Sequence, residues 1–392
     1  MWIITNFVTL TIPVTYTDLR FELFLSDCTS CHALFHHSVL LSVRGSMQAI
    51  LMPEPGRAVV TTVPDPLPRP GEALLRVRRV GLCGSDLNSF RGLNPLVSYP
   101  RIPGHEIAAT VLSLPETLPA ELRALAVGMD VTLSPYSSCG HCSACLAQRP
   151  NACQHNQTLG VQRDGALAER IAVPVDRLFP ATLGDPPLTL EELVLVEPLT
   201  VGFHAVARAR VQPSETVLIL GSGGVGLGAV AAAATRGATV LAVDLSEARL
   251  TTARLAGAAH TLRFDPATLA DSVRALTDGH GPSVVIEAVG TPETFCTAVD
   301  LVAFAGRVVY IGYAKQPVAY ETRLFVQKEL DIRGSRNALP EDFRAVIQML
   351  SARRFPVHAA IGSIVPFAKA PETFIRWKDD PGAFTKIVIA LD

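Results

Sequence analysis

The segment Val217-Leu-Ile-Leu-Gly221-Ser-Gly-Gly-Val-Gly226 sets a short apolar run directly before a glycine-rich turn. Small residues follow as far as Gly237, and a second apolar run, Val240 to Val243, ends at Asp244. Apolar runs of this length bounded by glycine are typical of buried strands, and the stretch between them is long enough for a helix. The segment therefore predicts a strand–turn–helix–strand unit with both strands in one parallel sheet.

The glycines of this turn suit a bound dinucleotide. Gly221 permits the tight turn, Gly223 lets the backbone approach a pyrophosphate, and Gly226 allows the helix to pack closely on the strand. Gly224 and Val225 open the helix, whose free N–H groups and positive dipole end face the phosphates. A G-x-G-x-x-G pattern alone is a weak signal, but its place between a strand and a helix makes it specific. The alternative is a glycine turn without a ligand.

Asp244, at the end of the second strand, can accept hydrogen bonds from the adenosine ribose hydroxyls, and its charge repels a 2′-phosphate. NAD is therefore the expected cofactor rather than NADP. Arg249, on the helix that follows, works against this choice because a nearby arginine can accommodate a 2′-phosphate. The expected cofactor-binding residues are Gly221, Gly223, Gly224, Val225, Gly226, Asp244 and Arg249.

The rest of the chain divides into two regions. From Met47 to about Glu197, short strands and turns predominate, whereas strands and helices alternate from about Leu199 to Arg333. Alternation of this kind predicts a parallel sheet with crossover helices. The predicted fold class is α/β, with a mostly β domain followed by a doubly wound parallel sheet.

Composition limits the class of protein. The 392 residues are 48% apolar and 18% charged, which permits a large core. At roughly 100–200 residues per domain, the length suggests two domains or three. Thirty-four basic residues face 36 acidic ones without a basic stripe, so nucleic acid is not an expected partner. The most apolar stretch, Val217 to Val243, is interrupted by polar residues and glycine, so no membrane span is expected.

Residues 1–46 look unlike the rest of the chain. They hold two cysteines and three histidines, Cys28, Cys31, His32, His36 and His37. Such a cluster can bind metal. No basic segment followed by an apolar run and a cleavage site is visible, which argues against a secretory signal. We expect a poorly ordered extension, or upstream sequence read through from a wrongly chosen start, with enzyme-like sequence beginning at Met47.

Four of the eight cysteines crowd into one short segment, with the spacing Cys139-x2-Cys142-x2-Cys145-x7-Cys153. In an intracellular chain such crowding indicates metal, and four thiolates suit tetrahedral zinc without an open position. Such a zinc is structural and orders a surface lobe that has little core of its own. His141, inside the loop, is interpreted as a solvated residue. A zinc-ribbon module for nucleic acid is the alternative, but its two-plus-two spacing is missing.

Single candidates for chemistry lie in Gly81-Leu-Cys83-Gly-Ser85-Asp86, in Gly104-His105-Glu106 and in Val196-Glu197-Pro198-Leu199. A lone cysteine or histidine most often serves packing. Glu197 stands where the β region gives way to the nucleotide region, and a ligand cleft is expected at such a junction.

The ordered motifs resemble those of the zinc-containing medium-chain dehydrogenase/reductase superfamily. The motifs are Cys83-Gly-Ser-Asp86, Gly104-His-Glu106, the Cys139–Cys153 lobe, and Gly221 to Gly226 with Asp244. The resemblance runs from Met47 to Asp392. It implies a GroES-like catalytic domain at 47–198 and 337–392 with its zinc lobe at 139–153, and a Rossmann NAD-binding domain at 199–336.

Within this superfamily the chain is most similar to the polyol and sugar-acid dehydrogenases, of the sorbitol, galactitol-phosphate and L-galactonate types. Glu197 in place of a cysteine supports this, as does Asp244 with Arg249. Residues 98–103 and 334–343 resemble the L-galactonate type most closely.

The resemblance assigns roles to single residues. Cys83 and His105 match ligands of the catalytic zinc, and either Glu106 or Glu197 matches the third protein ligand. Asp86 matches the residue that orients the zinc-bound histidine. The chain would then hold one catalytic and one structural zinc, and would pass hydride between NAD and a secondary alcohol.

Three further positions bear on this chemistry. Ser85 is placed by its motif to accept the alcohol proton. Many relatives have a histidine five residues after the cysteine ligand, where this chain has Asn88, and asparagine does not titrate. Proton exit is therefore expected through water, Glu106 or Glu197. Arg336 is a candidate for the far end of a polyhydroxy or carboxylate substrate, and equally for a structural salt bridge.

The leading hypothesis is an NAD-linked dehydrogenase of a polyol, sugar alcohol or sugar acid, with an L-galactonate-like substrate favoured. One alternative is the same fold acting on simple alcohols or threonine. Another is a catalytically silent nucleotide-binding scaffold, against which the intact set of candidate residues argues. The expected partner is a small-molecule alcohol, and the resemblance implies a cytoplasmic homo-oligomer, either a tetramer or a dimer.

Overall fold

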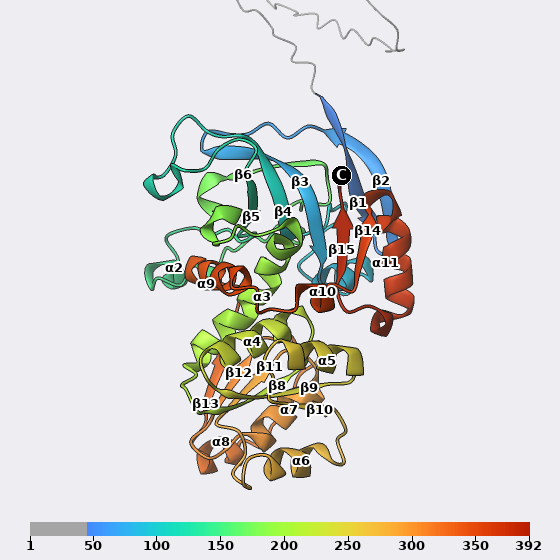
Figure 1. The fold of residues 1–392 in the computed structure, drawn as a ribbon. Coiled ribbons are helices and arrows are strands. Elements are labelled where there is room, and N and C mark those ends of the chain that lie inside the picture. Colours follow the sequence, from blue (N-terminus) through green and yellow to red (C-terminus); the bar gives the residue numbers. More distant parts are fainter. Residues whose placement is uncertain (1–44) are drawn as a thin grey trace, which may run out of the picture. The chain divides into compact units, whose positions relative to one another are not determined.

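The strands around the glycine-rich turn form the centre of a parallel sheet. The computed structural model describes residues 45–392, and the metal-binding hypothesis for Cys28, Cys31 and the neighbouring histidines lies outside those residues. Within the described part, six strands pair in the order β10-β9-β8-β11-β12-β13 (Figure 1), all in parallel. They are β8 (Thr216–Leu220), β9 (Thr239–Asp244), β10 (His260–Arg263), β11 (Val284–Glu287), β12 (Arg307–Tyr310) and β13 (Asp331–Gly334).

The two faces of this sheet enter different cores. The helices around it are α3 (Leu190–Ala209), α4 (Gly224–Thr235), α5 (Glu247–Leu255), α6 (Leu269–Ala275), α7 (Pro292–Leu301) and α8 (Arg323–Gln327). Val217 and Ile219 lie in a core shared with α3 and α4, while Leu218 and Leu220 lie in a core shared with α6 and α7. Successive strand residues point to opposite faces, so helices cover both sides of the sheet. The predicted doubly wound arrangement is confirmed.

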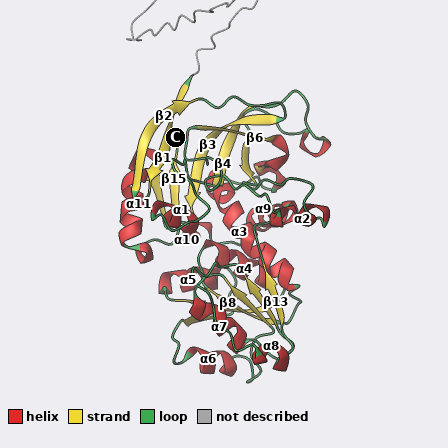
Figure 2. Ribbon diagram, turned by 180° about the vertical axis from the view of Figure 1, so that it is seen from behind, coloured by secondary structure: helices red, strands yellow, loops and turns green. Residues whose placement is uncertain are grey.

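A second sheet contains the mostly β region. Its strands run in the order β14-β15-β3-β4-β5-β7, with β6 also paired to β3, and β1 and β2 form a separate pair. Figure 2 labels β1 to β4, β6 and β15 of this region. The bounds are β1 (Ser46–Glu54), β2 (Arg57–Pro64), β3 (Glu72–Leu82), β4 (Glu106–Ser113), β5 (Asp130–Leu133), β6 (Arg170–Pro174), β7 (Leu178–Pro180), β14 (Ser363–Pro366) and β15 (Ile387–Ala390). Because β15 pairs antiparallel with β3, the C-terminal segment completes this sheet.

The other helices of the described chain lie before α3 or after β13 in the sequence. They are α1 (Gly84–Phe90), α2 (Ser143–Leu146), α9 (Pro340–Ser351), α10 (Val357–Ala360) and α11 (Ala370–Asp379). Single 3-10 turns lie at η1 (Ala120–Leu122), η2 (Pro150–Ala152), η3 (Val175–Arg177), η4 (Ala181–Leu183), η5 (Phe367–Lys369) and η6 (Pro381–Ala383).

Helix α3 joins the two sheets. At its start the Thr189 side chain accepts from the Glu192 backbone N–H while the Glu192 carboxylate accepts from the Thr189 backbone N–H. This reciprocal cap satisfies two donors that a helix start leaves free. The predicted domain boundary after residue 198 falls inside α3, so one continuous helix passes from the β region into the nucleotide region.

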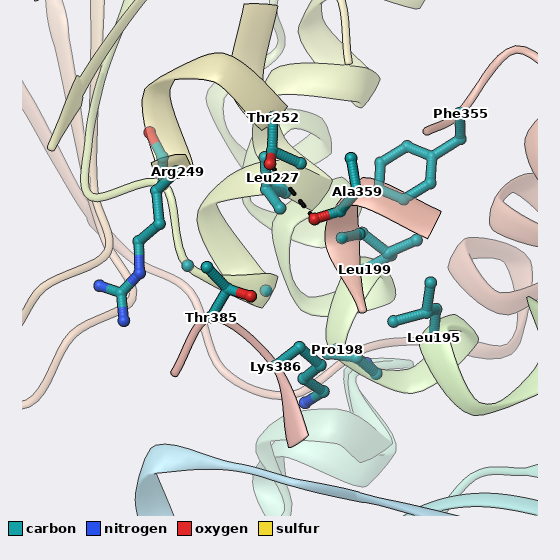
Figure 3. Close-up of a pocket in the computed structure, with 14 residues that line it drawn as sticks. Leu195, Pro198, Leu199, Leu227, Arg249, Thr252, Phe355, Ala359, Thr385 and Lys386 are labelled. Carbon is teal, nitrogen blue, oxygen red and sulfur yellow. Dashed lines mark hydrogen bonds between the residues drawn. The ribbon is translucent and has the colours of Figure 1, made fainter. Parts of the chain in front are cut away.

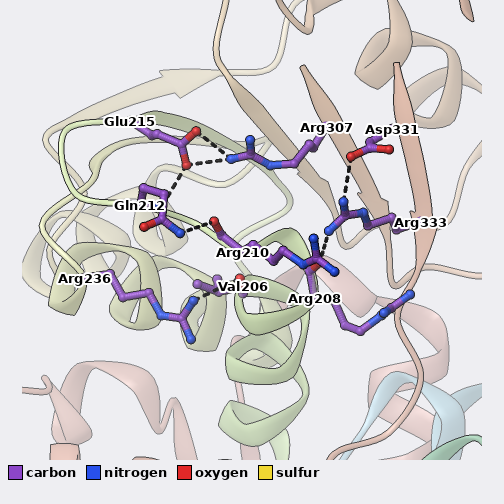
Figure 4. Close-up of polar contacts among 9 residues, drawn as sticks. All are labelled: Val206, Arg208, Arg210, Gln212, Glu215, Arg236, Arg307, Asp331 and Arg333. Atoms are coloured by element: carbon purple, nitrogen blue, oxygen red, sulfur yellow. Dashed lines mark hydrogen bonds and ion pairs between the residues drawn. The ribbon is translucent and has the colours of Figure 1, made fainter. Parts of the chain in front are cut away.

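Charged residues fasten the end of α3 to the nucleotide sheet (Figure 4). Arg307 Nη2 donates to both carboxylate oxygens of Glu215 at 2.6 Å. Arg333 donates to the Arg208 carbonyl at 2.7 Å and to Asp331 at 2.6 Å. These bonds tie β12 and β13 to the loop before β8 and to the last turn of α3.

Most of the elements predicted around the glycine-rich turn are confirmed. The apolar runs at 217–220 and 240–243 form β8 and β9, each within one residue of the observed bounds, and the stretch between them forms α4. The sequence pattern did not predict β10 or β13. Among residues 45–392, no helix combines the length and apolar character needed to cross a bilayer.

We expect Gly226→Ala to destabilise the fold, because a Cβ at this position would lie 1.9 Å from the Gly221 carbonyl oxygen. Overpacking of this kind costs about 1–3 kcal/mol. Gly224→Ala is the matched control, since its Cβ would lie 3.5 Å from the Pro198 Cβ, an ordinary contact. Denaturant unfolding of both variants measures the difference, and equal midpoints would contradict the packing role of Gly226.

Candidate active site

Strand register brings three candidate ligands together. Gly81 of β3 pairs with Glu106 of β4, so Cys83, just after β3, lies beside His105 and Glu106. Ligand atoms of Cys83, His105 and Glu106 all lie within 4.8 Å of one another. His105 and Glu106 are buried, with 6% and 1% of their surface exposed. A thiolate, an imidazole and a carboxylate at this spacing suit zinc with one position left open for substrate.

Asp86 holds the two loops of this cluster together. Its Oδ2 accepts from the Cys83 backbone N–H at 2.8 Å, and its Oδ1 accepts from the Gly104 backbone N–H at 3.3 Å. His105 Nδ1 lies 3.8 Å from Asp86 Oδ1, which is ion-pair range rather than a hydrogen bond. Burial would lower the pKa of His105, but the negative charge of Asp86, with smaller effects of Cys83 and Glu197, raises that pKa well above its usual value.

Glu197 approaches the cluster from α3 without belonging to the group of three ligand atoms. Its Oε1 accepts a hydrogen bond from the Tyr136 hydroxyl. Burial raises the pKa of Glu197 to about 7, against the lowering effect of nearby His105. The site therefore has two carboxylates, with Glu106 beside Cys83 and His105, and Glu197 beside Tyr136.

Lys386 is a site residue that the sequence reasoning missed. Its Nζ pairs with Glu106 Oε2 and donates to the Leu82 carbonyl at 3.2 Å. Burial would lower the pKa of Lys386, but the charge of Glu106 outweighs it and raises that pKa. In the sequence, Lys386 is a single cation before an apolar strand, and only the pairing of β15 with β3 reveals its partner.

Lys386 also reaches the glycine-rich turn. One pocket is lined by Ser222, Gly223 and Gly224 of the turn together with Pro198 and Lys386. Figure 3 shows the side chains of Pro198 and Lys386 at this pocket. The Lys386 Nζ lies 4.0 Å from the position that a Cβ on Gly224 would occupy. The buried ammonium of Lys386 therefore lies between the glycine-rich turn, which is expected to hold phosphates, and the carboxylate of Glu106.

The turn itself has the predicted geometry. Gly221 has φ +93°, a conformation that favours glycine. A Cβ on Gly223 would meet no atom within 4 Å, so the backbone there is open to a ligand. Helix α4 begins at Gly224 and directs its first N–H groups toward this opening. These features fit a pyrophosphate.

Asp244 lies at the end of β9, next to this turn. Its Oδ2 accepts from the Ser222 N–H at 2.8 Å and its Oδ1 from the Ser246 N–H at 2.9 Å. Arg249 Nη1 is 3.8 Å from Asp244 Oδ1, and Arg249 Nη2 donates to the Phe384 carbonyl at 3.3 Å. The guanidinium is therefore held between Asp244 and the C-terminal segment.

The four-cysteine lobe has the dimensions of a zinc site. All four Sγ atoms lie within 4.8 Å of one another, and Cys142 Sγ is 3.5 Å from Cys145 Sγ and 3.9 Å from Cys153 Sγ. A disulfide requires about 2.05 Å. Zn–S bonds of about 2.3 Å in a tetrahedron place sulfur atoms ~3.8 Å apart. Backbone N–H groups of Gln154 and Cys145 lower the pKa of Cys142 to about 6, which favours the thiolate that zinc binds.

Comparison with known proteins covers both regions of the chain. The alcohol dehydrogenase GroES-like domain matches residues 69–183, and the zinc-binding dehydrogenase domain matches residues 224–352. L-galactonate-5-dehydrogenase of Escherichia coli is 34% identical over 333 residues, which are 84% of this chain and 95% of the relative. Sorbitol dehydrogenase of Bacillus subtilis is 33% identical over 299 residues, 75% of this chain and 83% of the relative.

The chain belongs to the zinc-containing medium-chain dehydrogenase/reductase superfamily. It is an oxidoreductase of the polyol and sugar-acid dehydrogenase branch. An alcohol dehydrogenase of Escherichia coli CFT073 complexed with NADH is 27% identical with a TM-score of 0.79, covering 88% of this chain and 99% of that one. A Sinorhizobium meliloti protein bound to NADP is 27% identical with a TM-score of 0.79, covering 89% and 100%.

In this dehydrogenase, Ser85 and Asn88 lie one turn apart on α1. Ser85 Oγ is buried and finds no hydrogen-bond partner within residues 45–392. Asn88 Oδ1 accepts from Lys315 Nζ at 3.1 Å, and Lys315 follows β12 of the nucleotide sheet. Lys315 is a second residue that the sequence reasoning missed, because the two residues are far apart in the chain. A lysine from the nucleotide region thus contacts Asn88 of α1.

Arg336 and His204 lie near the zinc lobe. The Arg336 carbonyl accepts from Asn151 Nδ2 at 2.8 Å, and its guanidinium forms no ion pair with any residue in 45–392. His204 of α3 contacts Asn151 Nδ2 through Nε2 at 3.0 Å and Asp342 Oδ2 through Nδ1 at 2.8 Å. These buried contacts join the lobe, α3 and α9.

We expect Lys386→Met to lower the stability of the zinc-free protein by about 3–5 kcal/mol, because Glu106 is left as an unpaired buried charge. Unfolding in the presence of a chelator measures the loss. The double variant Lys386→Met/Glu106→Gln removes both charges and is expected to recover most of it. If the double variant is no more stable than Lys386→Met, the ion pair is not the cause.

We expect Asn88→His to change the pH profile of turnover more than the affinity for cofactor. An imidazole with an ordinary pKa near 6.5 adds a titrating group in the neutral range. Alcohol oxidation should then rise as that group loses its proton with increasing pH. Steady-state kcat against pH, with Asn88→Ala as control, checks this. Superimposable profiles for the native and histidine forms would count against a relay at this position.

Proposed function

We propose that this oxidoreductase transfers hydride between NAD and a secondary alcohol of a polyol, sugar alcohol or sugar acid, with an L-galactonate-like substrate favoured. The observation that carries the proposal is the group of Cys83, His105 and Glu106, whose ligand atoms lie within 4.8 Å of one another and in which His105 and Glu106 are buried. This group stands next to the glycine-rich turn through Lys386. Similarity to L-galactonate-5-dehydrogenase over nearly the whole length of that relative supports the substrate class.

Two zinc ions per chain form part of the proposal. Cys139, Cys142, Cys145 and Cys153 would hold a structural zinc. Cys83, His105 and Glu106 would hold a catalytic zinc. Glu197 would then contact a water bound at the open position of that zinc. In the alternative arrangement, Glu197 takes the place of Glu106 as the third ligand. A catalytic zinc supplies a Lewis acid that polarises the hydroxyl of the bound alcohol.

Other residues around the catalytic group would carry the alcohol proton, hold the ligand-bearing loops and contact the substrate. Ser85 is proposed to take the alcohol proton, since its buried Oγ lacks a partner in the described chain. Asp86 fixes the loops that carry Cys83 and His105. Proton exit is proposed through water, Glu106 or Glu197. Arg336, whose backbone carbonyl accepts from Asn151 of the lobe, is proposed to meet the far end of the substrate through its guanidinium.

We propose NAD rather than NADP as the cofactor because of the charged groups expected near the adenosine ribose. The Asp244 carboxylate would repel a 2′-phosphate. Arg249, the nearest candidate to neutralise that phosphate, contacts Asp244 and the Phe384 carbonyl instead. The cofactor would bind along Gly221, Gly223, Gly224, Val225 and Gly226, with its pyrophosphate at the start of α4.

We base the domain organisation and the oligomeric state on the resemblance to the polyol and sugar-acid dehydrogenases. We propose a catalytic domain at 47–198 and 337–392, a nucleotide domain at 199–336, and a cytoplasmic homo-oligomer, either a dimer or a tetramer. The pairing of β15 with β3 supports the assignment of the C-terminal segment to the catalytic domain.

An NAD reduction assay across sugar alcohols, aldonates, threonine and short simple alcohols tests the proposal. We expect kcat/KM for the best polyhydroxy substrate to exceed that for ethanol on the order of a hundredfold or more, because a site built to bind hydroxyls rejects compounds that lack them. NAD should be preferred to NADP. Activity confined to short alcohols or threonine would replace this substrate class with the simpler one.

Metal analysis separates the enzyme from a silent scaffold. We expect about two tightly bound zinc ions per chain after dialysis, and about one in His105→Ala, with the lobe unaffected. Cys145→Ser should instead reduce zinc in the lobe. A native protein with one zinc and no activity on any compound of the panel would identify a scaffold.

A further inference from the structure

The zinc lobe carries a second group of metal-binding side chains on its exposed side. Ligand atoms of Cys139, His141 and His155 lie within 4.8 Å of one another. Both histidines are exposed, and Cys139 is partly exposed, whereas the other three cysteines of the lobe are buried. The two groups share Cys139, so one thiolate faces both the interior of the lobe and the solvent.

His141 is oriented as a metal ligand. Its Nδ1 lies 2.8 Å from the Cys139 carbonyl oxygen. A carbonyl oxygen can only accept, so Nδ1 carries the hydrogen and Nε2 keeps a free lone pair. Metal-bound histidines commonly donate their second ring N–H to a backbone carbonyl, which fixes both tautomer and ring direction. This hydrogen bond therefore prepares Nε2 of His141 to bind a cation.

His155 is fixed beside it. The His155 backbone N–H donates to Cys153 Sγ at 3.3 Å, which anchors the residue to the lobe. The rings of His141 and His155 have centroids 6.1 Å apart with planes inclined by 28°. Two imidazoles and one thiolate held in this way offer three ligands to one ion and leave its remaining position to water.

Charge favours a cation at this place. Zinc bound by four thiolates carries a net charge of about −2, and the thiolate of Cys139 is the part of that site nearest the solvent. A second divalent ion beside Cys139 would neutralise this charge. Imidazole and thiolate are ligands that zinc accepts, so zinc is the expected occupant.

We propose that Cys139, His141 and His155 form an open surface zinc site through which the ion enters the four-cysteine site. Zinc first binds the two imidazoles and the Cys139 thiolate. It then exchanges the imidazoles for the sulfurs of Cys142, Cys145 and Cys153, whose remaining protons pass to solvent as the Zn–S bonds form. In the loaded protein the same three residues hold a further, weakly bound zinc.

The test uses the full chain with His141→Gln/His155→Gln, and His260→Gln/His280→Gln as a control that removes two exposed histidines elsewhere. Zinc per chain is measured against free zinc concentration. We expect a third equivalent at micromolar free zinc in the native and control proteins that is missing from the His141/His155 variant. Because all three proteins keep residues 1–44, any metal bound there contributes equally.

Loading of the lobe is followed separately by adding one equivalent of cobalt to metal-free protein in which all forms also carry His105→Ala, so that the Cys83 site stays empty. Cobalt bound to thiolate gives a charge-transfer absorption, which then reports the cysteine site of the lobe. In the His141/His155 variant, cobalt should enter the four-cysteine site roughly tenfold more slowly than in the native protein. Loss of groups that support a zinc site typically has an effect of about tenfold or more. The variant's final cobalt–thiolate signal should equal that of the native protein, which shows that the lobe still folds. Equal loading rates in all three proteins, or a third equivalent that the variant retains, would overturn the proposal.

Discussion

The buried pair of Lys386 and Glu106 is the interaction on which the site depends. Two opposite charges in the interior are stable only while each has its partner, because neither can return to water without unfolding its surroundings. Glu106 begins β4 beside His105, and Lys386 precedes β15, which pairs with β3. The pair therefore fixes the last strand of the chain against the cluster of Cys83, His105 and Glu106. It also places a cation where the phosphates of a dinucleotide are expected, so the proposed cofactor and metal sites share one charged group.

The features that sequence reasoning found are those whose chemistry is local. The glycine-rich turn could be predicted because its three glycines and the helix that follows them lie in one segment. The structure shows the close approach of Gly226 to Gly221 that the spacing predicts. The grouping of the four cysteines in the lobe could be predicted for the same reason. In both cases the residues that meet in space are also near in the chain.

The features that it missed depend on pairing between distant segments. Lys386 meets Glu106 only because β15 lies against β3, and Lys315 meets Asn88 only because the nucleotide region contacts α1. Strands β10 and β13 are short edge strands with partly exposed side chains, so they lack the apolar run that marked β8 and β11. The choice between Glu106 and Glu197 could not be made from spacing, since register decides which carboxylate lies beside Cys83.

The contacts of His204 have a consequence for how this lobe could be lost during evolution. His204, Asn151 and Asp342 are buried, and each satisfies a polar group of another. A deletion that removed the lobe with Asn151 would leave the ring of His204 and the carboxylate of Asp342 facing a void without enough hydrogen-bond partners. Descendants without the lobe should therefore carry apolar replacements at the positions of both His204 and Asp342, so the three positions are expected to change together rather than one at a time.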